Sequence, residues 1–482
     1  MRKFNRFLAL GLSLTMTAAC FTGCGKSKDD TTAATTAAAD TAATTAAADT
    51  DTETAATTVA AADEGKVLNI YCWNEEFKSR VTDHYPNYVD NGDNTGSIGD
   101  VKVVWTITPT DDNGYQNKLD EVLPNNQTAA ADDKVDLFLA EADYALKYVN
   151  SDYTVDVTSL GLTADDMANQ YQYTKDIVTD SNGVQKGVSW QACPGLYLYR
   201  RSVAKTVFGT DDPTEVQNYF KDWATFEDSA SKISAAGYKI LSGYDDAYRV
   251  FSNNVSAPWV DADGKIQIDA NIMAWVDQTK AFTDAGYNEK SSLWSAEWSK
   301  GASSSGDVFG YFGPAWFIDF CLAGYTLDNA DKTAAVGNGT WGDWGAVEGP
   351  QPYFWGGTWI CGATGTDNPS LVKDIMYQLT CNPDVMKEIV TADNDFCNNA
   401  PLMEDMASAG TTSAFLGGEN VLEKFVAGVG SINMSNISGY DQGLNESFQA
   451  AMKDYFDGTV DEDTALANFY SDATTKYPEL TY

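Results

Sequence analysis

The chain has 482 residues, 43% of them hydrophobic, which is enough for two or three domains with substantial cores. Asp and Glu outnumber Lys and Arg by 69 to 31, and the formal net charge of -38 would repel a phosphate backbone, so no nucleic-acid partner is expected. Histidine occurs once, at His84, which argues against Ser-His or Cys-His catalysis and against a zinc site built on histidines.

The first residues have the pattern of an export signal. Basic residues lie within the first six positions, an apolar run follows at 7–19, and Phe21-Thr-Gly-Cys24 comes next. Residues 1–23 resemble a bacterial lipoprotein signal peptide with Cys24 as the lipidated residue, although Phe21 stands where leucine or another aliphatic residue is usual. The resemblance implies a protein held on the cell membrane by that lipid and facing the extracellular side. Secretion without a lipid and an uncleaved anchor helix are the alternatives, the second disfavoured because the apolar run is too short to span a bilayer.

Residues 24–65 are predicted to be a tether. After Cys24 they consist largely of Thr, Ala and Asp in near-repeats, without an aromatic residue. Such a segment cannot bury enough apolar surface to offset the entropy of ordering it. As a coil it would have a root-mean-square reach of ~35 Å, enough to hold a folded body away from a membrane.

From Lys66 onward the sequence alternates between strand and helix signals. The predicted strands are 67–71, 101–107, 135–139, 188–190, 196–199, 238–241, 308–312 and 357–363. The predicted helices are 116–123, 143–150, 224–236, 272–284, 369–379, 383–390, 421–426, 444–456 and 462–473. This order favours parallel sheets flanked by helices. The turn Asp261-Ala-Asp-Gly264 predicts a hairpin; its acidic loop superficially resembles a calcium loop but lacks the downstream bidentate glutamate.

Aromatic residues stand beside carboxylates or amides where several predicted strands end. The first example is Trp73-Asn-Glu75 after strand 67–71, and the sites that share this character are 141–144, 186–190, 243–246, 310–318 and 353–360. Ligands of open α/β sheets bind at such strand ends. A sugar ring stacks its C–H faces on aromatic rings while its hydroxyl groups need carboxylate and amide partners. The pattern therefore indicates a carbohydrate ligand, although core packing is the competing interpretation for any single tryptophan.

The ordered set of motifs resembles the extracellular solute-binding lipoproteins of ABC sugar importers, which include maltose-binding protein. The motifs are, in order, VLNIYCWNEEF, VDLFLAEADYALKYV, QKGVSWQACPGLYLYRRSV, VFGYFGPAWFI, FWGGTWICGAT and FDGTVDEDTALANFYSDA. The resemblance covers 66–482. It implies an α/β, two-lobed periplasmic-binding-protein-like fold with discontinuous lobes joined by a multi-segment hinge.

By the same resemblance, each lobe is made from two stretches of chain. The N-terminal lobe is expected to comprise 66–191 plus 357–397, and the C-terminal lobe 196–354 plus 402–482. The chain would cross between them near 191–196, 354–358 and 394–403. The lobes would close on a ligand, and the closed form would be recognised by the ABC permease.

The resemblance also assigns the ligand site position by position. The substrate-binding residues are expected to be Trp73, Glu75, Glu141, Asp143, Trp190, Tyr244, Asp245, Asp246, Trp316 and Trp355, with Trp316 as the stacking platform. No catalytic residue, metal or cofactor is expected. The partners implied are a carbohydrate, an oligosaccharide by the number of aromatic residues, the permease subunits, and the membrane through Cys24; the protein itself is expected to be a monomer.

Other functions stay open at this point. A glycoside hydrolase that uses only carboxylates would show the same stacking residues and needs one carboxyl pair held roughly 5–9.5 Å apart. A binding module for a non-sugar solute is the third class. The six cysteines beyond Cys24 are interpreted as buried apolar residues, although one pair, such as Cys381 and Cys397, has a spacing that allows a disulfide.

Overall fold

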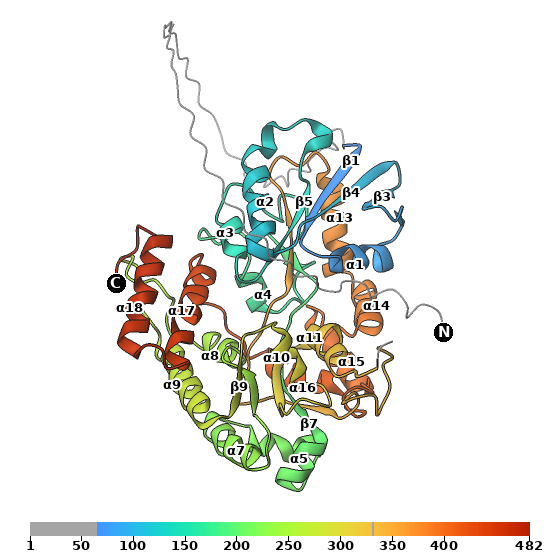
Figure 1. The fold of residues 1–482 in the computed structure, drawn as a ribbon. Coiled ribbons are helices and arrows are strands. Elements are labelled where there is room, and N and C mark those ends of the chain that lie inside the picture. Colours follow the sequence, from blue (N-terminus) through green and yellow to red (C-terminus); the bar gives the residue numbers. More distant parts are fainter. Residues whose placement is uncertain (1–64, 330–331) are drawn as a thin grey trace, which may run out of the picture. The chain divides into compact units, whose positions relative to one another are not determined.

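The computed structural model describes residues 65–329 and 332–482 (Figure 1). The predicted signal peptide, Cys24 and all but the last residue of the tether lie outside the described residues. That last residue, Gly65, is buried and donates its N–H to the carbonyl of Asp367 at 2.8 Å. The tether prediction is therefore wrong for Gly65, which is part of the folded body because it pairs with the loop before a helix.

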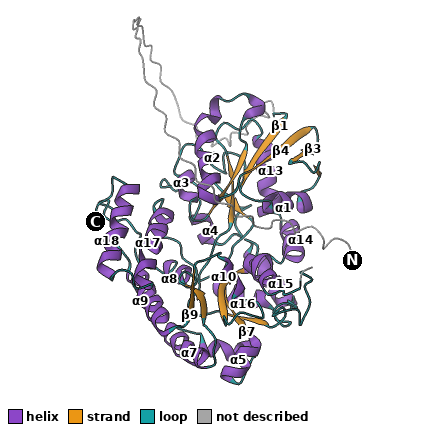
Figure 2. Cartoon of the chain, in the orientation of Figure 1, coloured by secondary structure: helices purple, strands orange, loops and turns teal. Residues whose placement is uncertain are grey.

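The secondary structure alternates between strands and helices along most of the chain (Figure 2). The strands are β1 (Val67–Cys72), β2 (Tyr88–Asp90), β3 (Thr95–Ile98), β4 (Val101–Ile107), β5 (Leu137–Glu141), β6 (Val188–Ser189), β7 (Gly195–Arg200), β8 (Leu241–Gly243), β9 (Asn288–Ser291), β10 (Gly310–Pro314), β11 (Trp344–Val347) and β12 (Thr358–Gly362).

The α-helices are α1 (Glu76–His84), α2 (Gly114–Val122), α3 (Ala145–Val149), α4 (Gln172–Asp176), α5 (Arg201–Phe208), α6 (Pro213–Val216), α7 (Trp223–Ala235), α8 (Tyr248–Ser252), α9 (Ala270–Ala285), α10 (Ala296–Lys300), α11 (Ala315–Phe317), α12 (Ala323–Tyr325), α13 (Pro369–Thr380), α14 (Pro383–Asp393), α15 (Ala400–Ala409), α16 (Val421–Val429), α17 (Asp441–Phe456) and α18 (Glu462–Lys476). Short 3-10 helices lie at Asp111–Asn113, Leu123–Thr128, Ala131–Asp133 and Gln217–Tyr219, and a π-helical turn, η5, at Ile318–Leu322. No helix of the described residues combines the length and the apolar content that a membrane span requires.

The first lobe is built on a mixed sheet. Within the described residues this sheet has the order β2-β3-β4-β1-β5-β12-β6. β1 runs parallel to β4 and β5, whereas β12 is antiparallel to β5 and β6. β5 is buried on both faces because helices cover it, which explains its continuous apolar sequence. The parallel strands β1 and β5 end at the same edge, so the polar residues after them are brought together.

The second lobe is built on smaller sheets, for which the prediction of parallel pairing is only partly right. β7 pairs antiparallel with both β10 and β11, and only β8 and β9 are parallel neighbours. The physical reason is the direction of the chain: β7 leads away from the crossing segments and β10 leads back to them. α17 packs on α18 and α9 at the edge of this lobe (Figure 1).

The segments predicted as crossings pair with one another. The backbone of Gln191 forms an antiparallel bridge with Cys397, and that of Pro194 forms one with Phe354. Four N–H···O bonds support these bridges: Ala192 to Phe396 at 3.0 Å, Asn398 to Trp190 at 2.7 Å, Gly195 to Tyr353 at 2.8 Å and Trp355 to Cys193 at 3.1 Å. Gly195 is required here because a Cβ at this position would lie 2.0 Å from the ring of Tyr353. Cys397 and Cys381 are free thiols, so the suggested disulfide between them is absent from the described structure.

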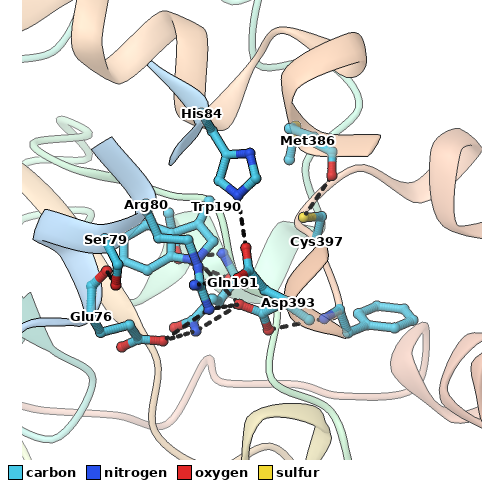
Figure 3. Close-up of polar contacts among 12 residues, drawn as sticks. Glu76, Ser79, Arg80, His84, Trp190, Gln191, Met386, Asp393 and Cys397 are labelled. Atoms are coloured by element: carbon cyan, nitrogen blue, oxygen red, sulfur yellow. Dashed lines mark hydrogen bonds and ion pairs between the residues drawn. The ribbon is translucent and has the colours of Figure 1, made fainter. Parts of the chain in front are cut away.

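A buried charge cluster joins α1 to two of the crossings (Figure 3). The guanidinium of Arg80 lies 3.0 Å from Asp393, 3.7 Å from Asp395 and 3.7 Å from Glu76. Gln191 donates its amide N–H groups to Glu76 and Asp395, both at 2.9 Å. Burial raises the pKa of Glu76 to about 7, against the opposing effect of Arg80. Glu76 therefore titrates near neutral pH at the base of the crossings.

Glu76 is expected to make folding stability pH-dependent. Its pKa is near 4.5 when unfolded and about 7 when folded, so the native state binds more protons between these values and loses stability as pH rises through them. We predict that the free energy of unfolding falls from pH 5 to pH 8 more steeply in the wild type than in Glu76→Gln, by ~1.4 kcal/mol per unit of pKa shift. Urea denaturation across this range measures the difference, and parallel curves for the two proteins would contradict the assignment.

Candidate functional site

A small cavity lies between the two lobes. Asp143, which follows β5 of the first lobe, and Arg249, on α8 of the second, both line it. Phe354 of a crossing segment closes one side, and Asp441 and Asn445 contribute from α17. The cavity measures about 50 Å³, well below the ~300–1,000 Å³ of pockets that hold small ligands. A ligand larger than a few water molecules therefore needs the walls of this cavity to move apart.

The strongest interaction in the cavity is an ion pair that connects the lobes. The two terminal nitrogens of Arg249 donate to the two carboxylate oxygens of Asp143, a bidentate geometry that carries the strength of charge-assisted hydrogen bonds. Both side chains are largely buried, at 25% and 27% exposure. Burial by itself would lower the pKa of Arg249, but the facing Asp143 carboxylate raises it above the ordinary value. Arg249 therefore keeps its positive charge at neutral pH.

Two further carboxyl groups beside this pair carry protons near neutral pH. Glu141 accepts the backbone N–H of Asp143 at 2.8 Å, and burial, followed by the charge of Asp143, raises its pKa to about 8. Asp441 accepts the N–H and the hydroxyl of Ser438 at 3.0 and 2.6 Å. Burial raises the pKa of Asp441 to about 7. Both groups can thus donate a hydrogen bond as acids or accept one as carboxylates.

Amide side chains complete the polar lining. The Asn253 oxygen accepts the backbone N–H of Phe354 at 2.7 Å, and the Asn445 oxygen accepts the indole N–H of Trp259 at 3.0 Å. Their NH₂ groups have no protein acceptor within the described residues. These donors are available to a ligand in the cavity.

A group of tryptophans lies next to the cavity along the crossing segment. Trp355 follows Phe354, and its ring centroid is 5.5 Å from that of Trp294 and 5.7 Å from that of Trp316. Trp316, in α11, donates its indole N–H to the Trp355 carbonyl at 3.1 Å. Trp294 follows β9 and keeps 49% of its surface exposed, although an exposed ring of this size is unusual in a folded protein. Trp294 is therefore the open member of the group, whereas Trp355 keeps only 9% of its surface exposed.

Three other predicted residues lie near strand ends with part of their surface accessible. Trp73 is half-buried and packs edge-on against Tyr115, with ring centroids 5.5 Å apart. Glu75 is 59% exposed and lies 3.8 Å from the ammonium group of Lys78. Asp245 accepts the backbone N–H of Leu293 at 3.5 Å, which places it beside Trp294.

Three predicted residues lie in the buried core of the structure. Trp190 is fully buried, stacks on Phe77 with centroids 5.6 Å apart, and donates its indole N–H to Asp395 at 3.2 Å. Tyr244 is 3% exposed, and its hydroxyl donates to Asp457. Asp246 is 7% exposed and is surrounded by donors from its own lobe. All three have their polar atoms occupied by protein partners.

Residues 91–411, more than half of the chain, match a family described as bacterial extracellular solute-binding protein. The chain belongs to this family. No curated protein matches the sequence. The family places the protein outside the cell and describes its members as binding proteins.

Solved structures of solute-binding proteins share the two-lobed fold. An extracellular solute-binding protein of family 1 has a TM-score of 0.66 and 18% identity, covering 85% of this chain and 99% of its own. The binding protein of B. animalis subsp. lactis, solved with β-1,6-galactobiose, has a TM-score of 0.62 and 16% identity over 87% of this chain and 100% of its own. The galacto-N-biose/lacto-N-biose I-binding protein of Bifidobacterium longum has a TM-score of 0.60 and 15% identity. The match covers 86% of this chain and 98% of that protein. At sequence identities this low, the similarity to these structures establishes the fold alone.

Sequence reasoning missed Arg249 and Trp294. Arg249 lies on the five-residue helix α8, which is too short to give a periodic signal, and its partner Asp143 is 106 positions away. Trp294 does follow a strand, but β9 reads Asn-Glu-Lys-Ser and has no apolar pattern. The search for aromatic residues that follow a strand would have found Trp294 if β9 had been predicted as a strand.

Asp246 provides a test of the distinction between core and site. Its carboxylate accepts the N–H groups of Ser242 and Gly243 at 2.7 and 2.9 Å and the indole N–H of Trp298 at 2.5 Å. We predict that Asp246→Asn lowers the free energy of unfolding by about 1–3 kcal/mol, because an amide NH₂ cannot accept from these donors. Ligand affinity of the folded fraction should stay within about two-fold. A large loss of affinity at unchanged stability, measured by urea denaturation and calorimetry, would place Asp246 in the site instead.

Proposed function

We propose that this protein captures a carbohydrate, an oligosaccharide, outside the cell and delivers it to the permease of an ABC transporter. The observation that carries the proposal is the polar cavity between the lobes with the tryptophan group beside it. A sugar needs both, because its C–H faces stack on rings while its hydroxyl groups exchange hydrogen bonds with carboxyl and amide groups. The galactobiose and lacto-N-biose in the two bifidobacterial neighbours are ligands of the same class.

In this proposal the site combines predicted residues with residues that the structure adds. Trp73, Glu75, Glu141, Asp143, Asp245, Trp316 and Trp355 stay assigned to it, and Trp294, Arg249, Asn253, Asp441 and Asn445 join them. Trp294 and Trp316 would form the stacking platform. Asn253 and Asn445 would donate to sugar oxygens. Trp190, Tyr244 and Asp246 support the lobes.

Capture would work by closure of the lobes about the crossing segments. The lobes are proposed to comprise 66–191 plus 357–397 and 196–354 plus 402–482. A cavity of about 50 Å³ has no room for a disaccharide, so the ligand must enter a wider state and then favour closure by its greater affinity for the closed form. No bond of the sugar is broken in this cycle, and the permease would recognise the closed protein, a monomer.

The N-terminal segment supplies the proposed attachment to the cell. Cleavage before Cys24 and lipidation of its thiol would anchor the protein on the extracellular side of the membrane. The Thr/Ala/Asp segment up to residue 64 would keep the binding lobes away from the bilayer surface. A single acyl chain binds a protein to a membrane only weakly, so stable anchoring through Cys24 would require more than one acyl chain on the lipid.

Loss of a stacking ring should weaken sugar binding. Against a panel of neutral mono- and disaccharides that includes β-1,6-galactobiose, we predict that the wild type binds at least one with a rise in melting temperature that grows with ligand concentration. Trp294→Ala and Trp316→Ala should each reduce that affinity by at least about ten-fold, ~1.4 kcal/mol. Trp341→Ala is the matched control, because Trp341 packs on Phe415 away from the cavity. Equal effects of all three substitutions, or a response only to amino acids, would contradict the assignment.

Replacement of the lipidated residue should release the protein. Cys24→Ala removes the only thiol that the signal pattern offers to a lipid at its cleavage site. We predict that this variant moves from the membrane fraction to the culture medium of an expressing bacterium, whereas Cys381→Ala, which alters a partly buried thiol, does not move. Retention of the Cys24 variant in the membrane fraction would contradict lipid anchoring.

A further inference from the structure

The charged groups that line the cavity already have protein partners. Its charged lining within the described residues consists of Asp143, Arg249, Asp269 and Asp441. Asp269 caps α9, accepting the N–H of Asn271 at 2.8 Å, and also accepts the N–H and hydroxyl of Ser256 at 2.9 and 2.6 Å. Asp441 is bonded to Ser438 in the same way. An anionic ligand would meet three carboxyl groups here.

Among the described residues that line the cavity, Arg249 is the one cation, so it alone could balance the charge of an anionic ligand there. Its terminal nitrogens are both engaged by Asp143, in the bidentate geometry that best matches a carboxylate. The carboxylate of Asp143 thus occupies the place that the carboxylate of an acidic sugar would need. A second carboxylate would be buried without a counter-charge, which is strongly unfavourable.

The groups that remain available in the cavity are uncharged. Among them are the amide NH₂ groups of Asn253 and Asn445, whose oxygen atoms are already used. The raised pKa of Asp441 points in the same direction, because burial there disfavours a further negative charge. Such donors suit the hydroxyl and ring oxygens of a neutral sugar.

We propose that the Asp143–Arg249 pair is a charge filter that makes this site accept uncharged saccharides and reject saccharides that carry a carboxylate. The inference rests on the proposed function, since it concerns which carbohydrate enters the same cavity. Asp143, on one lobe, accepts both hydrogen bonds that the terminal nitrogens of Arg249 donate from the other lobe. Removing the Asp143 carboxylate would leave the Arg249 guanidinium without a partner in the cavity. That free cation could then bind the carboxylate of an acidic sugar.

The test compares matched neutral and acidic probes by calorimetry. The probes are cellobiose, maltose and β-1,6-galactobiose, each with the uronic acid obtained by oxidising a primary hydroxyl group. The wild type should bind the best neutral probe at least about 100-fold more tightly than its acid, the scale of an unpaired buried charge. In Asp143→Asn, the freed guanidinium should reduce this ratio by about ten-fold or more through tighter binding of the acid.

Asp120→Asn is the control, because it removes one carboxyl group outside the cavity lining, where Asp120 pairs with Lys147 at 2.6 Å, and leaves Arg249 paired. Its ratio of neutral to acidic affinity should stay within about three-fold of the wild-type value. The double variant Asp143→Asn/Arg249→Gln should not show the tighter binding of the acidic probe that Asp143→Asn shows, because the guanidinium is then absent. Asp143→Ser takes the place of Asp143→Asn if thermal melting shows that the latter is unfolded.

The outcomes separate this inference from the function on which it rests. Equal binding of neutral and acidic probes by the wild type would overturn the filter and leave carbohydrate capture standing. An equal gain for Asp120→Asn and Asp143→Asn would show that overall charge, and not the release of Arg249, sets the preference, which also overturns the filter. Binding of none of the saccharides, with a response to another solute class, would overturn both.

Discussion

The backbone pairing of the crossing segments is the constraint from which the rest of the structure follows. Gln191 pairs with Cys397 and Pro194 with Phe354, so three stretches that are distant in sequence run side by side between the lobes. The first sheet is completed by β12, which follows the first stretch of the second lobe in sequence. Because β12 enters from the crossings, it must run antiparallel to β5, and its first residue, Thr358, pairs with Glu141 at the edge of the cavity.

The same segments place the chemistry of the site. Phe354 forms a wall of the cavity while its neighbour Trp355 carries the tryptophan group, so one dipeptide joins the polar and the aromatic halves of the site. The Asp143–Arg249 pair then links the lobes directly across the cavity. Truncating one partner of such a pair costs more than the pair itself contributes, because the other charge stays buried.

The sequence predicted elements of the fold that depend on local pattern and order. β1, β4 and β12 lie within one or two residues of their predicted positions. The assignment of Asp143, Trp316 and Trp355 to the ligand site, which came from the strand-end rule, stays a prediction. The rule failed for Trp190 because β6 ends inside the packed crossing region, where the ring lies against Phe77. It could not find Arg249, whose role depends on a partner from the other lobe. β2, β3 and β11 were missed because strands of three or four residues are too short to show a clear apolar pattern.

Equilibrium dialysis of the protein against neutral oligosaccharides, with mass spectrometry of both chambers after prolonged incubation, tests the central claim most directly. Reversible capture predicts that one saccharide group accumulates on the protein side and that its full mass is recovered on both sides. Recovery of shortened products would contradict a binding protein and indicate a glycoside hydrolase. Absence of accumulation for every saccharide would contradict the carbohydrate assignment itself.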